Sequence, residues 1–139
     1  DKLKKYISDY KLESVVKFVS FLPHPDSMKT MSYLDLTILP TYEETFGLVI
    51  AESMLVGTPV IGSNAGGVPE IIKDGNNGLL FDPKNVKSLR EKILNLYLNE
   101  DLRNKLSKNA HAFTSSQYNY DKHFISFSKY LSEILWKLI

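Results

Sequence analysis

Short apolar segments that alternate with helical patterns constrain the fold of this chain more than any other feature. Three of them, residues 36–39, 59–62 and 79–81, are rich in aliphatic residues, and residues 15–22 form a longer β-branched and aromatic run. Runs of this kind are typical of buried strands. Strands that alternate with helices form parallel sheets covered on both faces. The sequence therefore predicts an α/β fold with a parallel sheet and helices on both faces.

The segments between these runs carry apolar residues at helical spacing or lie between turn-forming residues. Asp26 follows a Pro-His-Pro turn as a helix cap, and Pro83 is a plausible first helical residue. The expected helices cover residues 1–12, 26–34, 46–57, 68–73, 83–97, 102–113 and 120–138. We find no repeat and no low-complexity linker, so residues 1–139 are assigned to one domain.

The composition excludes several classes of function. The chain is 43% hydrophobic and 24% charged, as in an ordinary globular domain, and its net charge of +1 predicts no nucleic-acid partner. It has no cysteine, which excludes disulfides and thiolate metal sites and fits a cytoplasmic location. No signal peptide or membrane-spanning run is visible. The three histidines lack carboxylates at metal-ligand spacing, so we expect no metal and no cofactor.

The segment 40–52, which follows the expected strand 36–39, places two carboxylates around the start of an apolar helix. Glu44 lies in the loop, Gly47 in the first helical turn and Glu52 further along the helix. The first amides of a helix have no partner within it and carry the positive end of its dipole, and a glycine there lets an anion approach closely. Ligands of open parallel sheets bind at the carboxyl ends of the strands. This segment is therefore a candidate phosphate site.

Each polar feature around this segment has two interpretations. The Glu52 carboxylate lies on a largely apolar helix, so it either accepts hydrogen bonds from a ligand such as a ribose diol, or is a solvated edge residue or a partner for a nearby lysine. Glu44 either binds sugar hydroxyls or is solvated like its neighbour Glu43. The loop at residues 63–67 either closes over a ligand with its backbone amides or is a flexible connection.

Several motifs in order extend this picture over nearly the whole chain. They lie at residues 16–21, 36–41, 44–48 with Glu52 and Ser53, 57–61, 66–72 and 74–80. At these positions the sequence resembles the carboxyl-terminal domain of retaining glycosyltransferases of the GT-B fold, in particular glycosyltransferase family 4, the glycosyl transferases group 1. The resemblance implies a Rossmann-like parallel sheet that binds a nucleotide-sugar, such as a UDP- or GDP-sugar.

The resemblance also implies a role for individual residues. Glu44 would be the catalytic carboxylate near the donor sugar, and Glu52 would bind the ribose hydroxyls. The other donor-binding residues would be Thr45, Phe46, Gly47, Leu48, Gly66 and Gly67 around the diphosphate and sugar, with Phe21, Leu22 and Pro23 at the base. Transfer would retain the anomeric configuration without a required metal, because fixed dipoles and cations would stabilise the leaving group. Thr45 stands where the family more often has glycine or serine, and it is a candidate helix N-cap.

The amino end departs from the family pattern. The family's domain begins with two further strands and a glycine-rich turn whose arginine and lysine face the diphosphate, whereas this sequence has only Arg90 and Arg103 as arginines. We therefore expect residues 1–139 to be a partial nucleotide-sugar-binding domain that lacks its first two strands and does not transfer sugar alone. The expected strand 15–22 would then have no obvious neighbour. A glycan or lipid acceptor would be bound through an amino-terminal domain.

Residues 119–139 are expected to form a closing helix with a long apolar stripe. This helix either crosses to the amino-terminal domain, as in the family, packs on this domain or a second copy, or associates peripherally with a membrane.

Two functions are open at this point. The chain is either the donor-binding part of a retaining glycosyltransferase or a non-catalytic module that binds a nucleotide-sugar or a protein. A sugar phosphorylase of similar fold would need a lysine-held cofactor, which no motif indicates.

Overall fold

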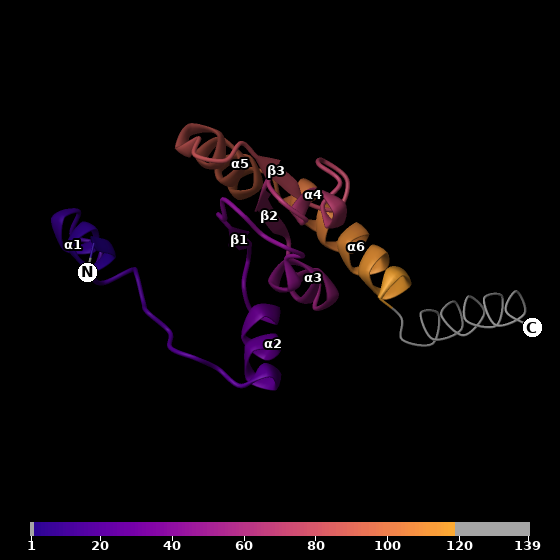
Figure 1. The fold of residues 1–139 in the computed structure, drawn as a ribbon, viewed down its shortest axis with the longest axis horizontal. Helices are drawn as coiled ribbons and strands as arrows, with labels where there is room; N and C mark the ends of the chain where they lie inside the picture. Colours follow the sequence, from indigo (N-terminus) through magenta and orange to yellow (C-terminus); the bar gives the residue numbers. More distant parts are fainter. Residues whose placement is uncertain (1, 119–139) are drawn as a thin grey trace, which may run out of the picture.

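A computed structural model of the chain describes residues 2–118 and contains a parallel sheet with helices around it (Figure 1). The strands are β1 (Thr37–Leu39), β2 (Val60–Ser63) and β3 (Leu79–Phe81), in this order across the sheet. The helices are α1 (Lys2–Asp9), α2 (His24–Ser32), α3 (Leu48–Leu55), α4 (Val68–Ile71), α5 (Val86–Leu98) and α6 (Glu100–Gln117). Each strand was expected from its short apolar run.

The sheet is parallel throughout, so its three strands end at the same edge. Thr37 lies opposite Val60 in the first pair of strands, and Ile61 lies opposite Leu79 in the second. Alternate residues of a strand point to opposite faces. Val60 and Ile61 therefore pack into two different apolar clusters.

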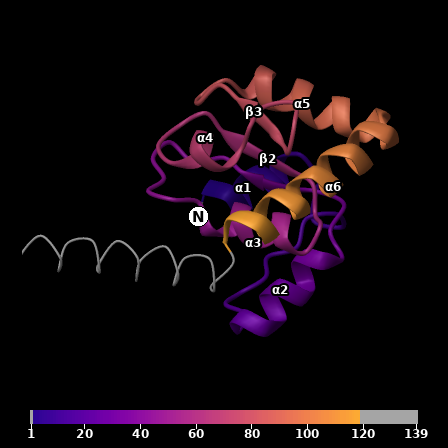
Figure 2. The same cartoon turned by 90° about the vertical axis from the view of Figure 1, so that its right-hand side faces the viewer.

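The two clusters form the core, one on each face of the sheet. The first contains Ile50 and Met54 of α3 and Ile71 of α4, while the second contains Leu96 of α5 and Leu106 of α6. Helix α6 crosses the sheet between α5 and α3 (Figure 2) and contributes to both clusters. The structure thus confirms the α/β fold with helices on both faces.

The amino-terminal segment differs from the sequence prediction. Helix α1 forms within the expected range 1–12, but residues 12–23 contain no strand, and the prediction of a strand at residues 15–22 is wrong. These residues run as an exposed connection between α1 and α2, and α1 stands apart from the sheet (Figure 1). A strand needs a neighbour for its backbone hydrogen bonds, and the described residues provide none beside this segment.

Several helix boundaries also differ from the expected ones. Helix α2 starts at His24, after Pro23, rather than at an Asp26 cap, since prolines are well tolerated in a first helical turn. Helix α5 starts later than Pro83, with Asn85 as the cap whose side chain accepts a hydrogen bond from the Ser88 amide. The expected helix at residues 120–138 and the closing segment 119–139 lie outside the described residues.

Candidate functional site

The loops that follow the three strands meet at the carboxyl edge of the sheet. The loop after β1 contains Glu44, the loop after β2 contains Gly66 and Gly67, and the loop after β3 contains Lys84. Parallel pairing places all three loops at one edge. The segments that the sequence analysis singled out for chemistry therefore lie at the edge where open parallel sheets bind ligands.

Helix α3 begins at this edge, and no side chain of residues 2–118 caps its first backbone amides. Gly47 is its N-cap, in the left-handed conformation with a φ of 85°, and no side chain caps the helix. The interpretation of Thr45 as an N-cap is therefore wrong, and the helix begins at Leu48 rather than at Phe46. Only glycine adopts this φ without strain. The chain thus turns at Gly47 into α3, whose first amides lack the acceptors that amides further along a helix have.

Glu44 and the Gly66-Gly67 pair are joined through the backbone. The Gly67 amide donates to the Glu44 carbonyl over 2.8 Å, and the Phe46 amide donates to Glu44 Oε1 over 3.3 Å. A Cβ on Gly67 would lie 2.3 Å from the Thr45 carbonyl oxygen, so the two loops touch with no room for a side chain. The loop at residues 63–67 is therefore packed against the Glu44 segment, and its Gly67 amide is not free for a ligand.

Glu52 lies on α3 and is half-buried, with 25% of its side chain exposed. Its Oε1 atom is 3.2 Å from His24 Nε2, at the first residue of α2. Within residues 2–118 the side chain that pairs with this carboxylate is His24 and not a lysine. The Glu52 side chain therefore extends from α3 toward the start of α2, where His24 is its polar neighbour.

A cavity of about 460 Å³ opens beside Glu52 between α3 and α6. Its lining is largely apolar and consists of Phe46, Leu48, Ala51, Glu52, Leu55, Thr114, Ser115 and Tyr118. The rings of Phe46 and Tyr118 meet edge to face with their centroids 5.8 Å apart. Burial raises the pKa of the Tyr118 hydroxyl, and the negative charge of Glu70 raises this pKa further. Tyr118 therefore stays a neutral hydrogen-bonding group over a wide pH range.

The residues expected at the base are only partly near this cavity. Phe21 is 90% exposed, and neither Phe21 nor Leu22 lines the cavity. Pro23 does not line the cavity either, but it directly precedes His24, whose side chain contacts Glu52. The positions of Phe21 and Leu22 follow from the exposed path of residues 12–23.

Among the described residues, few cationic side chains lie at the carboxyl edge of the sheet. Lys84 Nζ lies 5.6 Å from the centroid of the Tyr42 ring, in the loop after β3. Arg103 instead donates to the Leu96 and Tyr97 carbonyls at the end of α5. Within residues 2–118 no three His, Asp or Glu side chains gather as metal ligands, and no helix combines the length and apolar character needed to cross a bilayer.

Sequence reasoning missed two parts of this site. It did not connect His24 with any carboxylate, although His24 contacts Glu52 across 28 positions of sequence. It also did not connect α6 with the site, although Thr114, Ser115 and Tyr118 line the cavity. Neither link had a local signal, because both depend on how α2 and α6 pack against α3.

The parallel sheet, with helices on both faces and its polar loops at one edge, is a Rossmann-like α/β domain of the kind found in GT-B glycosyltransferases. Residues 1–113 match the family described as glycosyl transferases group 1, and the chain belongs to this family. The resemblance to the glycosyl transferases group 1 is therefore confirmed.

Curated relatives cover most of this chain. An uncharacterized glycosyltransferase of Methanocaldococcus jannaschii is 32% identical over 136 residues, which are 96% of this chain and 38% of the relative. The N-acetyl-alpha-D-glucosaminyl L-malate synthase of Bacillus anthracis is 30% identical over 105 residues, or 75% of this chain and 28% of the relative. The chain thus spans less than half the length of these relatives.

Solved structures show the same architecture. HepE from Anabaena, in complex with UDP-glucose, matches with a TM-score of 0.86 and 30% identity over 95% of this chain and 36% of HepE. The carboxyl-terminal domain of LpcC, a glycosyl transferase group 1 family protein of Francisella tularensis, matches with a TM-score of 0.77 and 28% identity. That match covers 86% of this chain and 62% of the LpcC domain.

Proposed function

We propose that residues 1–139 form the donor-binding part of a retaining glycosyltransferase that transfers a sugar from a UDP- or GDP-sugar to a glycan or lipid acceptor. The observation that carries this proposal is the meeting of Glu44, the start of α3 and the Gly66-Gly67 loop at one edge of the sheet. The complex of the similar protein HepE with UDP-glucose supports a nucleotide-sugar as the ligand. Acceptor binding and sugar transfer are proposed for the whole protein, because the relatives are much longer than this chain.

The individual roles follow the chemistry of each group. The amides at the start of α3 would bind the diphosphate, since they are unpaired within the helix and carry the positive end of its dipole. Glu52 would accept hydrogen bonds from the two ribose hydroxyls, and the neighbouring cavity would receive apolar parts of the ligand. Glu44 would act on the donor sugar as the catalytic carboxylate. A cytoplasmic location and peripheral membrane association belong to the same proposal for the whole protein.

Calorimetric titration of the chain with UDP, GDP and ADP tests donor binding. We expect one diphosphate to bind more tightly than the other two, and Glu52→Ala to weaken its binding by about tenfold to a hundredfold. A carboxylate that accepts hydrogen bonds from a diol contributes about 1.5 to 3 kcal/mol. Glu91→Ala, which removes an exposed glutamate of α5, is the matched control and should bind like the parent chain.

The outcomes separate the parts of the proposal. If none of the three diphosphates binds the parent chain, donor binding by these residues is wrong. If Glu52→Ala binds as tightly as Glu91→Ala, donor binding stands and the ribose assignment of Glu52 is wrong.

A further inference from the structure

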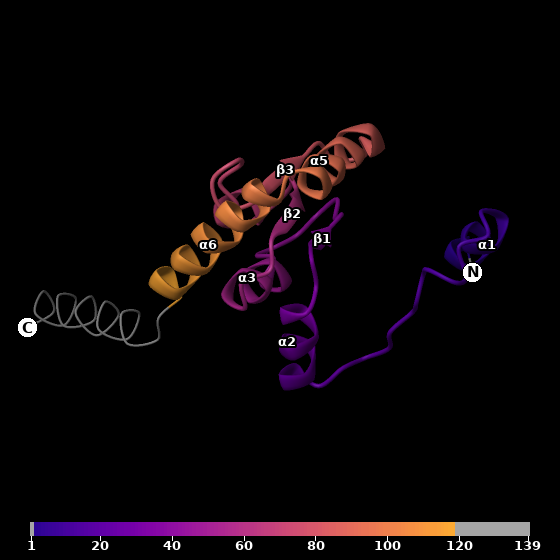
Figure 3. The same ribbon diagram turned by 180° about the vertical axis from the view of Figure 1, so that it is seen from behind.

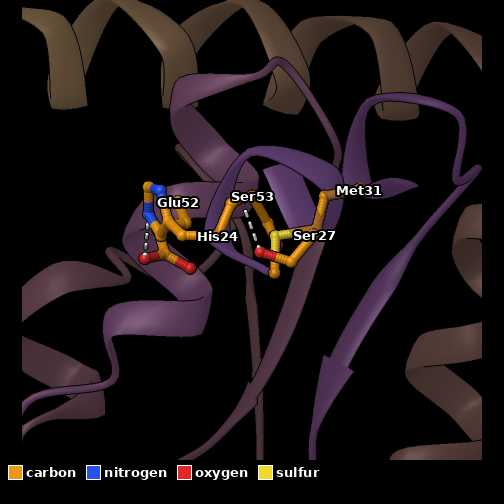
Figure 4. A network of polar contacts seen from close by, with 5 residues as sticks. All are labelled: His24, Ser27, Met31, Glu52 and Ser53. Atoms are coloured by element: carbon orange, nitrogen blue, oxygen red, sulfur yellow. Dashed lines mark hydrogen bonds and ion pairs between the residues drawn. The ribbon is translucent and has the colours of Figure 1, made fainter. Parts of the chain in front are cut away.

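The Glu52 carboxylate has one polar side-chain partner among residues 2–118, and that partner is a histidine. His24 Nε2 and Glu52 Oε1 are 3.2 Å apart, within hydrogen-bonding distance (Figure 4). The other carboxylate oxygen of Glu52 has no protein partner within the described residues, and Glu52 borders the cavity between α3 and α6. One oxygen is thus engaged by the protein while the other is available to a ligand.

The backbone around His24 is well defined by local contacts. Pro23 precedes the helix and Pro25 lies in its first turn, so the backbone φ angle is restricted on both sides of His24. The Ser27 amide donates to the Pro23 carbonyl over 2.9 Å, and the Ser27 hydroxyl donates to the His24 carbonyl over 2.8 Å. The imidazole therefore extends from a fixed point at the start of α2.

The far end of α2 is attached to the core. The Thr58 hydroxyl donates to the Met31 carbonyl over 2.7 Å, and the Ser53 hydroxyl lies 3.6 Å from Met31 Sδ. Ser53 is fully buried, follows Glu52 on α3 and also donates to the Thr37 hydroxyl of β1. In the view of Figure 3, α2 lies directly below α3. The position of His24 relative to Glu52 is thereby set from both ends of α2.

The pair contributes little to the stability of the fold. The His24 side chain is 70% exposed, and exposed pairs of this kind add little to folding because water competes for both groups. A free glutamate on a helix samples several rotamers, and a ligand that binds one of them must restrict the side chain. A hydrogen bond from His24 Nε2 restricts it before the ligand arrives.

We propose that His24 is a positioning residue that holds the Glu52 carboxylate ready for the vicinal diol of a nucleoside. The imidazole donates from Nε2 to Oε1, and Oε2 remains free to accept a hydrogen bond from a ribose hydroxyl. Since the carboxylate has lone pairs for more than one donor on each oxygen, the second hydroxyl binds without displacing His24. This inference rests on the proposed function, because it requires that Glu52 binds ribose.

The test compares His24→Ala, His24→Gln and Lys29→Ala by calorimetric titration of the chain with the tightest binder among UDP, GDP and ADP. We expect His24→Ala to weaken binding by about threefold to tenfold, the effect of one hydrogen bond to a prepared acceptor. His24→Gln retains an N–H near the position of Nε2 and should recover most of the affinity. Lys29→Ala removes an exposed cation of the same helix and should bind like the parent chain.

The deoxyribonucleoside form of the same diphosphate separates positioning from a general effect on the site. It lacks one of the two ribose hydroxyls, so His24→Ala should weaken its binding less than that of the ribose form. The loss should also vanish when Glu52→Ala is already present, because His24 acts through Glu52. Circular dichroism and urea unfolding should show unchanged folding for each variant.

The possible outcomes distinguish a failure of the proposed function from a failure of the positioning role of His24. If the parent chain binds none of the three diphosphates, the proposed function is wrong and this inference falls with it. If the parent binds and Glu52→Ala weakens binding, but His24→Ala binds like the parent, only the positioning role is wrong. An equal loss for ribose and deoxyribose forms, or a loss that persists with Glu52→Ala, also contradicts positioning through Glu52.

Discussion

The contact between the loops after β1 and β2 makes a quantitative prediction for glycine substitutions. Gly67 has a φ of −78°, which any residue adopts, so Gly67→Ala destabilises the fold only through the steric clash of the added Cβ. Its Cβ would lie 2.3 Å from the Thr45 carbonyl oxygen, whereas real Cβ contacts are essentially never under 3.0 Å. Backbone must therefore move on at least one side, by roughly 1 Å, in a packed region of the molecule. Overpacking of this kind costs about 1 to 3 kcal/mol.

Two other glycines separate the steric effect from backbone strain. Gly75 has a φ of 73° and open space around a Cβ, so Gly75→Ala adds only the strain of a left-handed residue, about 1 kcal/mol. Gly66 has a φ of 56° and its Cβ would overlap the Glu44 backbone, so Gly66→Ala carries both penalties. We expect the destabilisation to increase from Gly75→Ala to Gly67→Ala to Gly66→Ala.

Urea unfolding followed by far-ultraviolet circular dichroism measures these differences. With a denaturant slope of about 2 kcal/mol per molar urea, a loss of 2 kcal/mol lowers the unfolding midpoint by about 1 M. Gly67→Ala should also weaken nucleoside diphosphate binding, because the backbone shift moves Glu44 and Thr45. A Gly67→Ala variant with the parent's midpoint, or one less destabilised than Gly75→Ala, would refute the close packing of these two loops.

Two further predictions concern groups outside the loop contact. Asn77→Ala should lower the free energy of unfolding by about 2 to 4 kcal/mol, measured by urea unfolding. The buried Asn77 side chain donates to the Ile71 carbonyl and accepts from the Lys73 amide, and both backbone groups would lose this partner. The control Asn76→Ala, at an exposed neighbouring position, should lower the free energy of unfolding much less. Glu70→Gln should lower the pKa of Tyr118 in an ultraviolet difference titration, because a negative charge near the hydroxyl disfavours the phenolate. Because the pKa of Tyr118 is raised in the folded state, the contribution of Tyr118 to stability is complete below pH 10 and decreases as the pH rises above it. An unchanged pKa of Tyr118 in Glu70→Gln would contradict the influence of Glu70.

Much of the fold was predictable because its signals are local. The strands β1, β2 and β3 coincide with short aliphatic runs between turn residues, a pattern typical of buried strands. The start of α3 was expected within two residues of its observed position, although Gly47 was expected inside the first helical turn and is instead the N-cap with a positive φ. The position of segment 40–52 directly after an expected strand then indicated the edge of the sheet at which the polar loops gather.

The sequence by itself therefore determined the elements that are stable through their own residues: the apolar strands, the amphipathic helices and the glycine turns. The tertiary structure decided whatever depends on a partner distant in the sequence. Residues 15–22 have the composition of a strand, but strand formation requires a neighbour for the backbone hydrogen bonds, and the described residues place none there. The pairing of His24 with Glu52 likewise exists only because α2 and α3 pack together, and side-chain contacts across 28 residues leave no periodic trace in a single sequence.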